Sequence, residues 1–265
     1  MELFQIGIYK TFTEKPMDAS ELFFLHTHNN YEIYCFLSGN GQYSAEGTIY
    51  DMSPGDVVLL RNMEAHLFIP KKNVPYKRIY LNFQPGPDLD SDFINSLLTP
   101  FLDRSTGSYN HYSASQFPNN HWQFYLDSIY EANDPIKRQI YLAALLQEFR
   151  DCFTIMKARR LTSPPNSITN ITQYIDNHLS SPLSLEQICH LFGTSVSQLN
   201  RNFKAVLGTT VGNYILTKRL LKAQSMIQQG KKPTHIYTQC GFQDYSAFFR
   251  AYRKYWGYNP SEDIN

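Results

Sequence analysis

The chain has 265 residues, enough for two domains, and its composition of 42% hydrophobic and 18% charged residues is that of a folded protein and excludes a disordered one. Its net charge of +1 conceals a division, because residues 1–156 hold 11 Lys/Arg and 18 Asp/Glu whereas residues 157–265 hold 13 and 5. The basic second part favours contact with a polyanion, while the lack of a long apolar run and of a secretion pattern argues against a membrane partner.

Short strands are predicted over residues 1–83, because β-branched and aromatic segments alternate there with Gly, Pro, Asn and Asp. The segments are LFFLHTH, YEIYCFLSG, GQYSAEGTIYDM, DVVLLR and YKRIYLNF. Strands this short, with turns this regular, indicate a sandwich or barrel over residues 1–90. Along YKRIYLNF the residues Arg78, Tyr80 and Asn82 alternate, so all three are expected to face the interior.

Helices are predicted over residues 91–156, where apolar residues recur every three or four positions in DFINSLLTPFL, NHWQFYLDSIYEAND and PIKRQIYLAALLQEFRDCFTIM. The last segment begins at Pro135, a favourable first-turn residue. Its apolar stripe is larger than a small barrel needs to cover: Ile140, Leu142, Leu145, Leu146 and Phe149. Two alternatives stay open, a helical hairpin packed within the subunit and a homodimer interface over residues 119–156.

A linker is predicted at KARRLTSPPNS, residues 157–167, because it combines basic residues, two prolines and small polar residues.

The domain that follows, residues 168–265, contains an internal repeat. Ile188 and Gly193 recur 48 residues later, and a longer set recurs 49 residues later. That set is Leu199, Arg201, Phe203, Lys204 and Gly208, matched by Phe248, Arg250, Tyr252, Arg253 and Gly257. Each copy has the order helix, Gly-containing turn, helix and Gly stop, which predicts two helix-turn-helix units.

The second helix of each copy separates apolar from basic residues at 100° per residue. Aromatic residues hold the helix on its core, and Arg201 and Lys204 in one copy match Arg250 and Arg253 in the other. Two matching basic faces within residues 157–265, whose 13 Lys/Arg and 5 Asp/Glu leave a net charge of +8, predict DNA binding, since a helix fits the major groove and Arg can donate two bonds to guanine. The intervening TVGNYILTKRLLKAQSMIQQG predicts a long helix that fixes the spacing of the two reading helices.

The segments SLEQICHLFGTSVSQLNRNFKAVLG and CGFQDYSAFFRAYRKYWGYNPSE resemble the double helix-turn-helix domain of AraC-family transcription regulators over residues 168–262. The resemblance implies contacts to DNA bases or phosphates from Ser197, Asn200, Arg201, Lys204, Asp244, Tyr245, Ser246, Arg250 and Arg253. Cys189 and Tyr237 occupy positions that usually hold Ala. Tyr245 is unusually bulky for a groove residue, so it either faces the DNA or stays in the core.

Residues 1–83 resemble the cupin-like barrel that such regulators commonly carry. His26, His28, Glu32 and Gly39 have the spacing of the first cupin motif, and Pro54-Gly55-Asp56 with His66 resembles the second. Arg61 and Met63 depart from that second motif. The resemblance implies an effector site built from His26, His28, Glu32, Arg61, His66, Arg78, Tyr80 and Asn82. The set His26, His28, Glu32 and His66 could also hold a metal, but we expect an effector pocket without a metal or other cofactor.

Together these features predict an α+β protein: a cupin-like barrel followed by helices over residues 1–156, a linker, and an all-α double helix-turn-helix domain over residues 168–265. The expected function is ligand-responsive transcription regulation, with a small polar effector such as a sugar, promoter DNA and, for an activator, RNA polymerase as partners. The unpaired Cys35, Cys152, Cys189 and Cys240 favour a reduced, cytoplasmic protein. The alternatives are a metal-dependent cupin enzyme tethered by its basic domain and a purely structural helical module.

Overall fold

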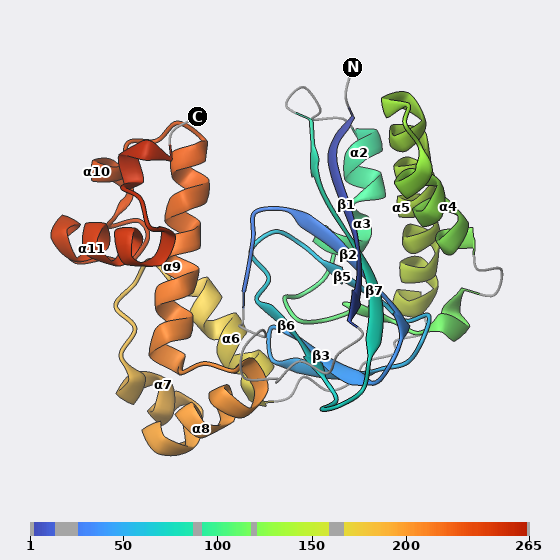
Figure 1. Cartoon of the computed structure of the whole chain (residues 1–265). Coiled ribbons are helices and arrows are strands. Elements are labelled where there is room, and N and C mark those ends of the chain that lie inside the picture. Colours follow the sequence, from blue (N-terminus) through green and yellow to red (C-terminus); the bar gives the residue numbers. More distant parts are fainter. Residues whose placement is uncertain (1–2, 14–25, 87–91, 118–120, 159–166, 264–265) are drawn as a thin grey trace. The chain divides into compact units, whose positions relative to one another are not determined.

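The computed structural model describes residues 3–13, 26–86, 92–117, 121–158 and 167–263. The chain divides into two compact units, one built around the strands and one around the C-terminal helices (Figure 1). Most of the predicted linker, residues 159–166, lies outside the described residues. Within the described ranges, no helix combines the length and the apolar character that crossing a membrane requires.

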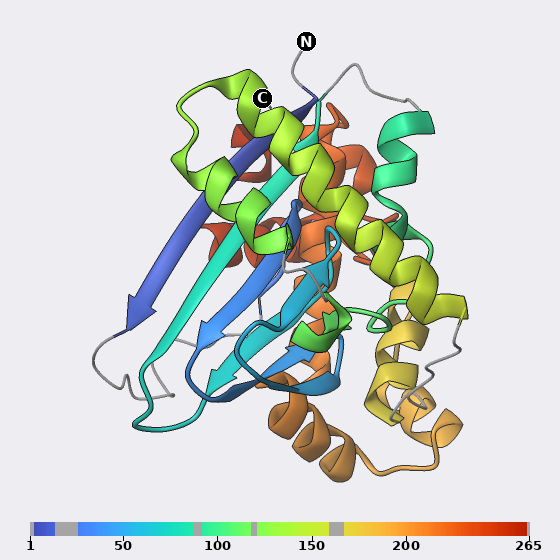
Figure 2. The same cartoon turned by 90° about the vertical axis from the view of Figure 1, so that its right-hand side faces the viewer.

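The described strands of the first unit form two sheets. The five-stranded sheet has the order β1-β7-β2-β5-β8, and the three-stranded sheet has the order β4-β3-β6 (Figure 2). Their bounds are β1 Phe4–Thr13, β2 Tyr31–Ser38, β3 Gly41–Ala45, β4 Thr48–Met52, β5 Val57–Leu60, β6 His66–Pro70, β7 Tyr76–Pro85 and β8 His111–Tyr112. Strand β7 pairs antiparallel with β1 on one side and with β2 on the other.

The two faces of the five-stranded sheet have different partners because side chains alternate along each strand. On β7, Ile79, Leu81 and Phe83 are buried in the core that the sheet shares with the helices of this unit. Arg78, Tyr80 and Asn82 lie on the opposite face, as predicted, and are only partly buried. On that face Tyr34, Phe36, Tyr43 and Phe68 belong to the core between the two sheets.

Helices flank β8 in the chain, and Figure 2 shows the long ones lying across one face of the five-stranded sheet. They are α2 Asp92–Leu97, α3 Thr99–Leu102, α4 His121–Glu131 and α5 Pro135–Ala158. Most of the apolar stripe predicted on α5 is buried within the subunit, including Leu142, Leu145, Leu146 and Phe149. Ile140 is the exception, with 60% of its surface exposed. The packed hairpin therefore accounts for most of the stripe, and Ile140 belongs to a different surface.

The sequence predicted most elements of this unit but not all of their boundaries. GQYSAEGTIYDM is a hairpin rather than one strand, because Glu46 and Gly47 both have positive φ and turn the chain between β3 and β4. DFINSLLTPFL forms two short helices instead of one. Strand β1 was not predicted, although Phe4, Ile6 and Ile8 alternate with polar or small residues. Most of LFFLHTH lies outside the described residues.

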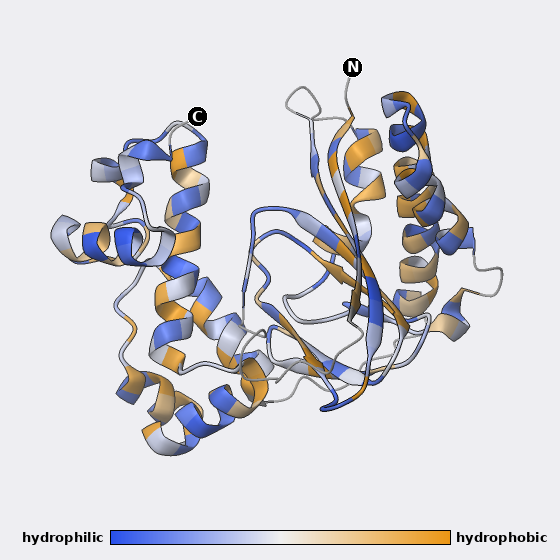
Figure 3. Ribbon diagram, viewed as in Figure 1, coloured by the Kyte–Doolittle hydropathy of each residue, from blue (hydrophilic) through white to orange (hydrophobic). Residues whose placement is uncertain are grey.

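The second unit is helical, as predicted. It contains α6 Ser167–Asn177, α7 Leu185–Leu191, α8 Val196–Leu207, α9 Val211–Gln228, α10 Pro233–Ile236 and α11 Tyr245–Trp256. Helix α9 alternates between apolar and polar stretches (Figure 3). Its C-terminal half packs on α10 and α11 through Leu220, Ala223 and Ile227, while Tyr214 near its start contacts Phe203 of α8. Helices α8 and α11 therefore pack on opposite halves of α9 (Figure 1).

Residue-specific caps fix the ends of these helices. Ser184 and Gln187 form the predicted capping box of α7, and Ser195 accepts a hydrogen bond from Gln198 N as the predicted cap of α8. Helices α8 and α11 both end at a left-handed glycine, Gly208 and Gly257. The two copies of the repeat therefore begin and end their second helices in the same way.

Candidate DNA-binding surface and effector site

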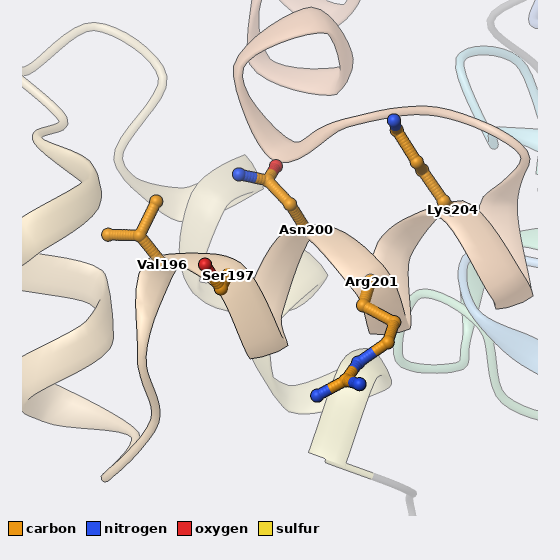
Figure 4. A pocket seen from close by; sticks show the side chains of 5 residues that line it. All are labelled: Val196, Ser197, Asn200, Arg201 and Lys204. Carbon is orange, nitrogen blue, oxygen red and sulfur yellow. The ribbon is translucent and has the colours of Figure 1, made fainter.

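Helix α8 presents a shallow hollow to solvent, here called the first hollow. It has a volume of roughly 410 Å³ and is lined by Val196, Ser197, Asn200, Arg201 and Lys204 (Figure 4). Arg201 and Lys204 are exposed and extend away from the helix in different directions. For four of the five lining residues the sequence predicts a contact with DNA: Ser197, Asn200, Arg201 and Lys204.

Helix α11 presents a second hollow, of roughly 380 Å³, lined by Tyr245, Ser246, Phe249 and Arg250. Each of these residues stands 49 positions after a residue of the first hollow: Val196, Ser197, Asn200 and Arg201. The internal repeat therefore reproduces the surface as well as the fold. The two hollows share a serine and an arginine but differ in the other two positions, which are polar or aliphatic in the first hollow and aromatic in the second.

Asn200 has a structural partner that the sequence did not indicate. Its Oδ1 atom accepts a hydrogen bond of 3.1 Å from the backbone N–H of Val211, the first residue of α9. That N–H is one of the donors that a helix N-terminus leaves without an internal partner. Because an amide oxygen has two lone pairs, Asn200 keeps its NH2 group and one acceptor position for a base while it holds the start of α9.

Asp244 and Tyr245 also have local partners. The Asp244 carboxylate accepts a 2.7 Å hydrogen bond from Ala247 N and caps α11. Tyr245 is half-buried, and its ring contacts Tyr237, Phe248 and Phe249 while it lines the second hollow. Both positions considered for Tyr245 are thus combined, since its ring packs on the core and still borders the surface. Arg250, Ser246 and Arg253 are exposed.

The aromatic residues of α11 divide between core and surface. Phe248 and Tyr252 are fully buried, whereas 42% of the Tyr255 surface is exposed. The Tyr252 hydroxyl bonds the Asp263 carboxylate, and burial, followed by that hydrogen bond, raises the pKa of Tyr252. Tyr255 therefore lies largely outside the core on which the other aromatic residues of this helix pack.

Three of the four cupin-motif side chains come together. The ligand atoms of His28, Glu32 and His66 all lie within 4.8 Å of one another. His26 is exposed and outside this group, although its ring lies 6.2 Å from that of His28. His66 Nδ1 is 2.8 Å from the Glu64 carbonyl, which leaves Nε2 as the atom facing the group. The expected set of three histidines and one carboxylate is therefore reduced to two histidines and one carboxylate among the described residues.

Arg61 contacts the loop around Glu64 and Arg104, which form a buried ion pair. Its guanidinium donates to the Arg104 carbonyl and Thr106 Oγ1 and lies 3.6 Å from Glu64. Glu64 in turn receives a fork of two 2.7 Å hydrogen bonds from Arg104. The two side chains of this fork are 1% and 0% exposed. The structure therefore gives Arg61 partners within its own loop, and a contact of Arg61 with an effector stays a prediction.

Charge within this network controls the ionisation of Glu64. Burial alone would raise the pKa of Glu64, but the Arg104 charge and hydrogen bonds, with a smaller contribution from Arg61, hold the pKa below its usual value. Asn110 Nδ2 and Gly107 N also donate to the same carboxylate. The sequence did not indicate Glu64 or Arg104, because neither belongs to a motif and they stand 40 positions apart.

Arg78, Tyr80 and Asn82 face the core between the sheets together with Tyr34. In the register of β2 and β7, Tyr34 stands opposite Tyr80 and diagonal to Arg78 and Asn82. The buried atoms Tyr34 Oη, Arg78 Nε and Asn82 Oδ1 have no hydrogen-bond partner among the described residues. Beside them, the sheet surface of β1 and β7 forms a polar hollow of roughly 270 Å³ that Asn82 and Gln84 help to line.

Comparison with known proteins agrees with this division of the chain. Residues 15–92 match the AraC-like ligand binding domain and residues 188–264 match a helix-turn-helix domain, together more than half of the chain. The chain belongs to the AraC family of transcription regulators. Within this family, the chain is 25% identical to the probable transcriptional regulator LumQ of Photobacterium leiognathi, with 95% of each chain covered. It is 23% identical to the HTH-type transcriptional activator RhaS of Escherichia fergusonii, covering 89% of this chain and 86% of that one.

Among solved structures, this AraC-family chain is similar to fatty acid-bound ToxT from Vibrio cholerae, with 17% identity, 98% and 94% coverage and a TM-score of 0.42. The sequence relatives are transcription regulators, so the cupin-enzyme alternative is not favoured. This AraC-family protein is a ligand-responsive, DNA-binding regulator built from a cupin-like sensing domain and a helix-turn-helix domain.

Proposed function

We propose that the protein reads two successive major-groove segments of promoter DNA, one with each hollow. The observation that carries this proposal is the equivalence of the two hollows. Each of the four residues that line the second hollow stands 49 positions after a residue that lines the first. Each hollow holds one exposed arginine, Arg201 or Arg250. An arginine in a major groove can donate two hydrogen bonds to guanine, so each hollow is suited to recognise a guanine.

The length of α9 supports simultaneous contact by both hollows. With 18 residues, this helix is about 27 Å long. Helices α8 and α11 pack on opposite halves of α9, which suits them to successive major-groove segments that lie about 34 Å apart. Lys204 and Arg253 stand one turn beyond the arginines and are exposed, which suits them to phosphate contacts.

Two arginine variants test this proposal. Arg201→Ala and Arg250→Ala should each weaken binding to promoter DNA by about 1–3 kcal/mol and relax selection at one position. Lys204→Ala should weaken binding equally for all sequences and lower the salt slope by about one unit. Lys72→Ala, which removes an exposed charge from the first unit, is the matched control. Wild-type DNA binding by both arginine variants would refute the assignment.

The proposed effector is a small polar molecule, such as a sugar, bound on the interior face of the five-stranded sheet. Support comes from the unpartnered polar atoms of Tyr34, Arg78 and Asn82, which are surrounded by aromatic side chains. Aromatic walls with a few placed polar groups are typical of small-molecule sites. Thermal denaturation of the full chain with a panel of sugars and small acids tests this, since a bound ligand raises stability.

The proposed assembly is a homodimer formed through residues 119–156, which activates transcription in the cytoplasm by contacting RNA polymerase. Helices α4 and α5 expose large apolar side chains there, including Phe124 at 61%, Ile136 at 70% and Ile140 at 60%. A second copy that covers these side chains would remove them from water.

The proposed regulation is a population shift, in which the effector binds one arrangement of the chain more tightly than another.

A further inference from the structure

Arg78 lies inside the sheet sandwich and has no anionic partner among the residues that the structure describes. Its guanidinium carbon lies 5.7 Å from the ring centroid of Tyr34, 6.0 Å from that of Tyr76 and 5.3 Å from that of Tyr80. No carboxylate among the described residues pairs with it, whereas Arg61 and Arg104 both contact Glu64. A partly buried charge usually has a partner, because removal from water is costly without one. Cation–π contacts supply only part of that compensation.

The Tyr34 hydroxyl provides a second donor close to this guanidinium. The Tyr34 side chain is 1% exposed, and no described residue meets its oxygen at normal hydrogen-bond geometry, although the Arg78 guanidinium lies close enough to interact with it. Burial raises the pKa of Tyr34, and the nearby Arg78 charge opposes that rise only in part. The hydroxyl therefore keeps its proton at neutral pH, so that it can donate a hydrogen bond but carries no negative charge of its own.

The structure assigns to this site a carboxylate-bearing effector, whose carboxylate is held by the Arg78 guanidinium and the Tyr34 hydroxyl. This inference rests on the proposed effector site and specifies its ligand class. Guanidinium groups recognise carboxylates through two parallel hydrogen bonds, and Arg78 has donors available for them. The three tyrosine rings exclude water from the pair and so strengthen it.

Asn82 indicates the other end of the effector. It stands four residues from Arg78 on β7 and therefore about 13 Å along the strand, on the same face. Its buried Oδ1 atom is an acceptor without a partner among the described residues. A hydroxyl of the effector can donate to this atom, and the Tyr80 ring between the two residues provides a flat apolar contact. A hydroxy acid therefore matches the chemistry of this row of residues better than a neutral sugar.

The test is thermal denaturation of the full chain with matched pairs of probes. The pairs are acetate and acetamide, benzoate and benzamide, and D-galacturonate and D-galactose. We expect the carboxylate of at least one pair to raise the melting temperature more than its neutral partner. Arg78→Gln should abolish that difference, and Arg78→Lys should retain part of it. Lys77→Gln, which removes the neighbouring exposed charge on β7, should leave it unchanged.

Three results would overturn the inference: equal effects within every pair, a larger effect of the neutral partners, or an unchanged carboxylate effect in Arg78→Gln. Melting of each variant without probe shows whether Arg78 is needed for folding, and the Arg78→Lys variant separates that role from anion binding. DNA binding of the wild type and of Arg78→Gln is measured in parallel at several salt concentrations. If the wild type does not bind DNA, the proposed DNA-binding function is refuted, whereas the result of the probe experiment for the carboxylate site still stands.

Discussion

The side-chain oxygen of Asn200 accepts a hydrogen bond from the backbone N–H of Val211, so one residue of the first hollow also fixes the start of α9. The turn between α8 and α9 is thereby held from the surface that we propose contacts DNA. The Asn200 oxygen has a second lone pair, which can accept from a base while this bond is kept. If Asn200 contacts DNA as proposed, the start of α9 therefore helps to set the orientation of its side chain.

Asn200→Ala should loosen the first turn of α9. Loss of a helix-capping hydrogen bond costs about 1 kcal/mol, which corresponds to about a fivefold increase in local opening. Hydrogen exchange followed by mass spectrometry on a peptide spanning residues 209–216 measures this directly. Ser197→Ala is the control, because Ser197 lines the same hollow without capping α9. Equal exchange in the Asn200 variant and the wild type would show that the bond contributes nothing.

Alanine should be tolerated better at Gly193 than at Gly241, although the two glycines are equivalent in the repeat. Both have positive φ, which costs a side chain about 1 kcal/mol. A Cβ atom at Gly193 would meet no atom within 4 Å, whereas one at Gly241 would lie 2.1 Å from the Leu179 carbonyl oxygen. Gly241→Ala therefore requires a backbone shift. Urea denaturation should show a clearly larger loss for Gly241→Ala, and equal losses would contradict the packing described here.

Glu64→Gln should destabilise the first unit by about 3–5 kcal/mol, since it leaves the buried Arg104 charge unpaired. Arg104→Lys should also be destabilising, because an ammonium group cannot reproduce the two-bond fork. The matched control is Asp127→Asn, which removes an exposed pair with Lys10 and should cost less than about 1 kcal/mol. Chemical denaturation of the three variants measures all of these effects.

The same carboxylate predicts a pH dependence. Because the folded-state pKa of Glu64 lies below its ordinary value of 4.5, its contribution to stability is complete above that value and is lost as the pH falls through the lower folded-state pKa. The wild type should therefore lose stability in this acidic range more steeply than Glu64→Gln. Denaturation midpoints collected from pH 7 to pH 3 test the sign. Parallel curves for the two proteins would exclude Glu64 as the cause.

Ile136→Glu combined with Ile140→Glu should convert a dimer to a monomer without unfolding the chain. The two side chains are one helical turn apart on α5 and are 70% and 60% exposed, so the substitutions remove no core contact. Sedimentation velocity of wild type and variant measures the change. Leu142→Ala is the contrasting variant, since Leu142 is fully buried and its truncation should lower stability by about 2–5 kcal/mol. A monomeric wild type would contradict the proposed dimer.

The sequence predicted the parts of this protein that depend on local patterns. Repeated spacing identified α8 and α11, and capping residues identified their starts at Ser195 and in the capping box of Ser184 and Gln187. Alternation along β7 placed Arg78, Tyr80 and Asn82 on one face. These signals succeed because they depend on neighbours within a few residues.

Interactions between distant segments could not be predicted in the same way. Arg104 and Glu64 meet only because the loop after α3 folds back beside β5, and no motif joins them. Arg61 was assigned to the effector site by its place in the cupin motif, whereas the folded loop directs its guanidinium to Arg104 and Thr106. Asn200 was assigned to base contacts alone, because its bond to Val211 depends on how the chain turns between two helices.

The chemical difference between the two hollows makes the proposed DNA-reading surface directional. Valine and asparagine occupy two positions of the first hollow, and tyrosine and phenylalanine occupy the same positions of the second. If both hollows contact DNA as proposed, a monomer rotated end to end would place aromatic rings at the base pairs that otherwise meet an asparagine. An asymmetric operator would therefore favour one orientation of the helix-turn-helix domain over the reverse one.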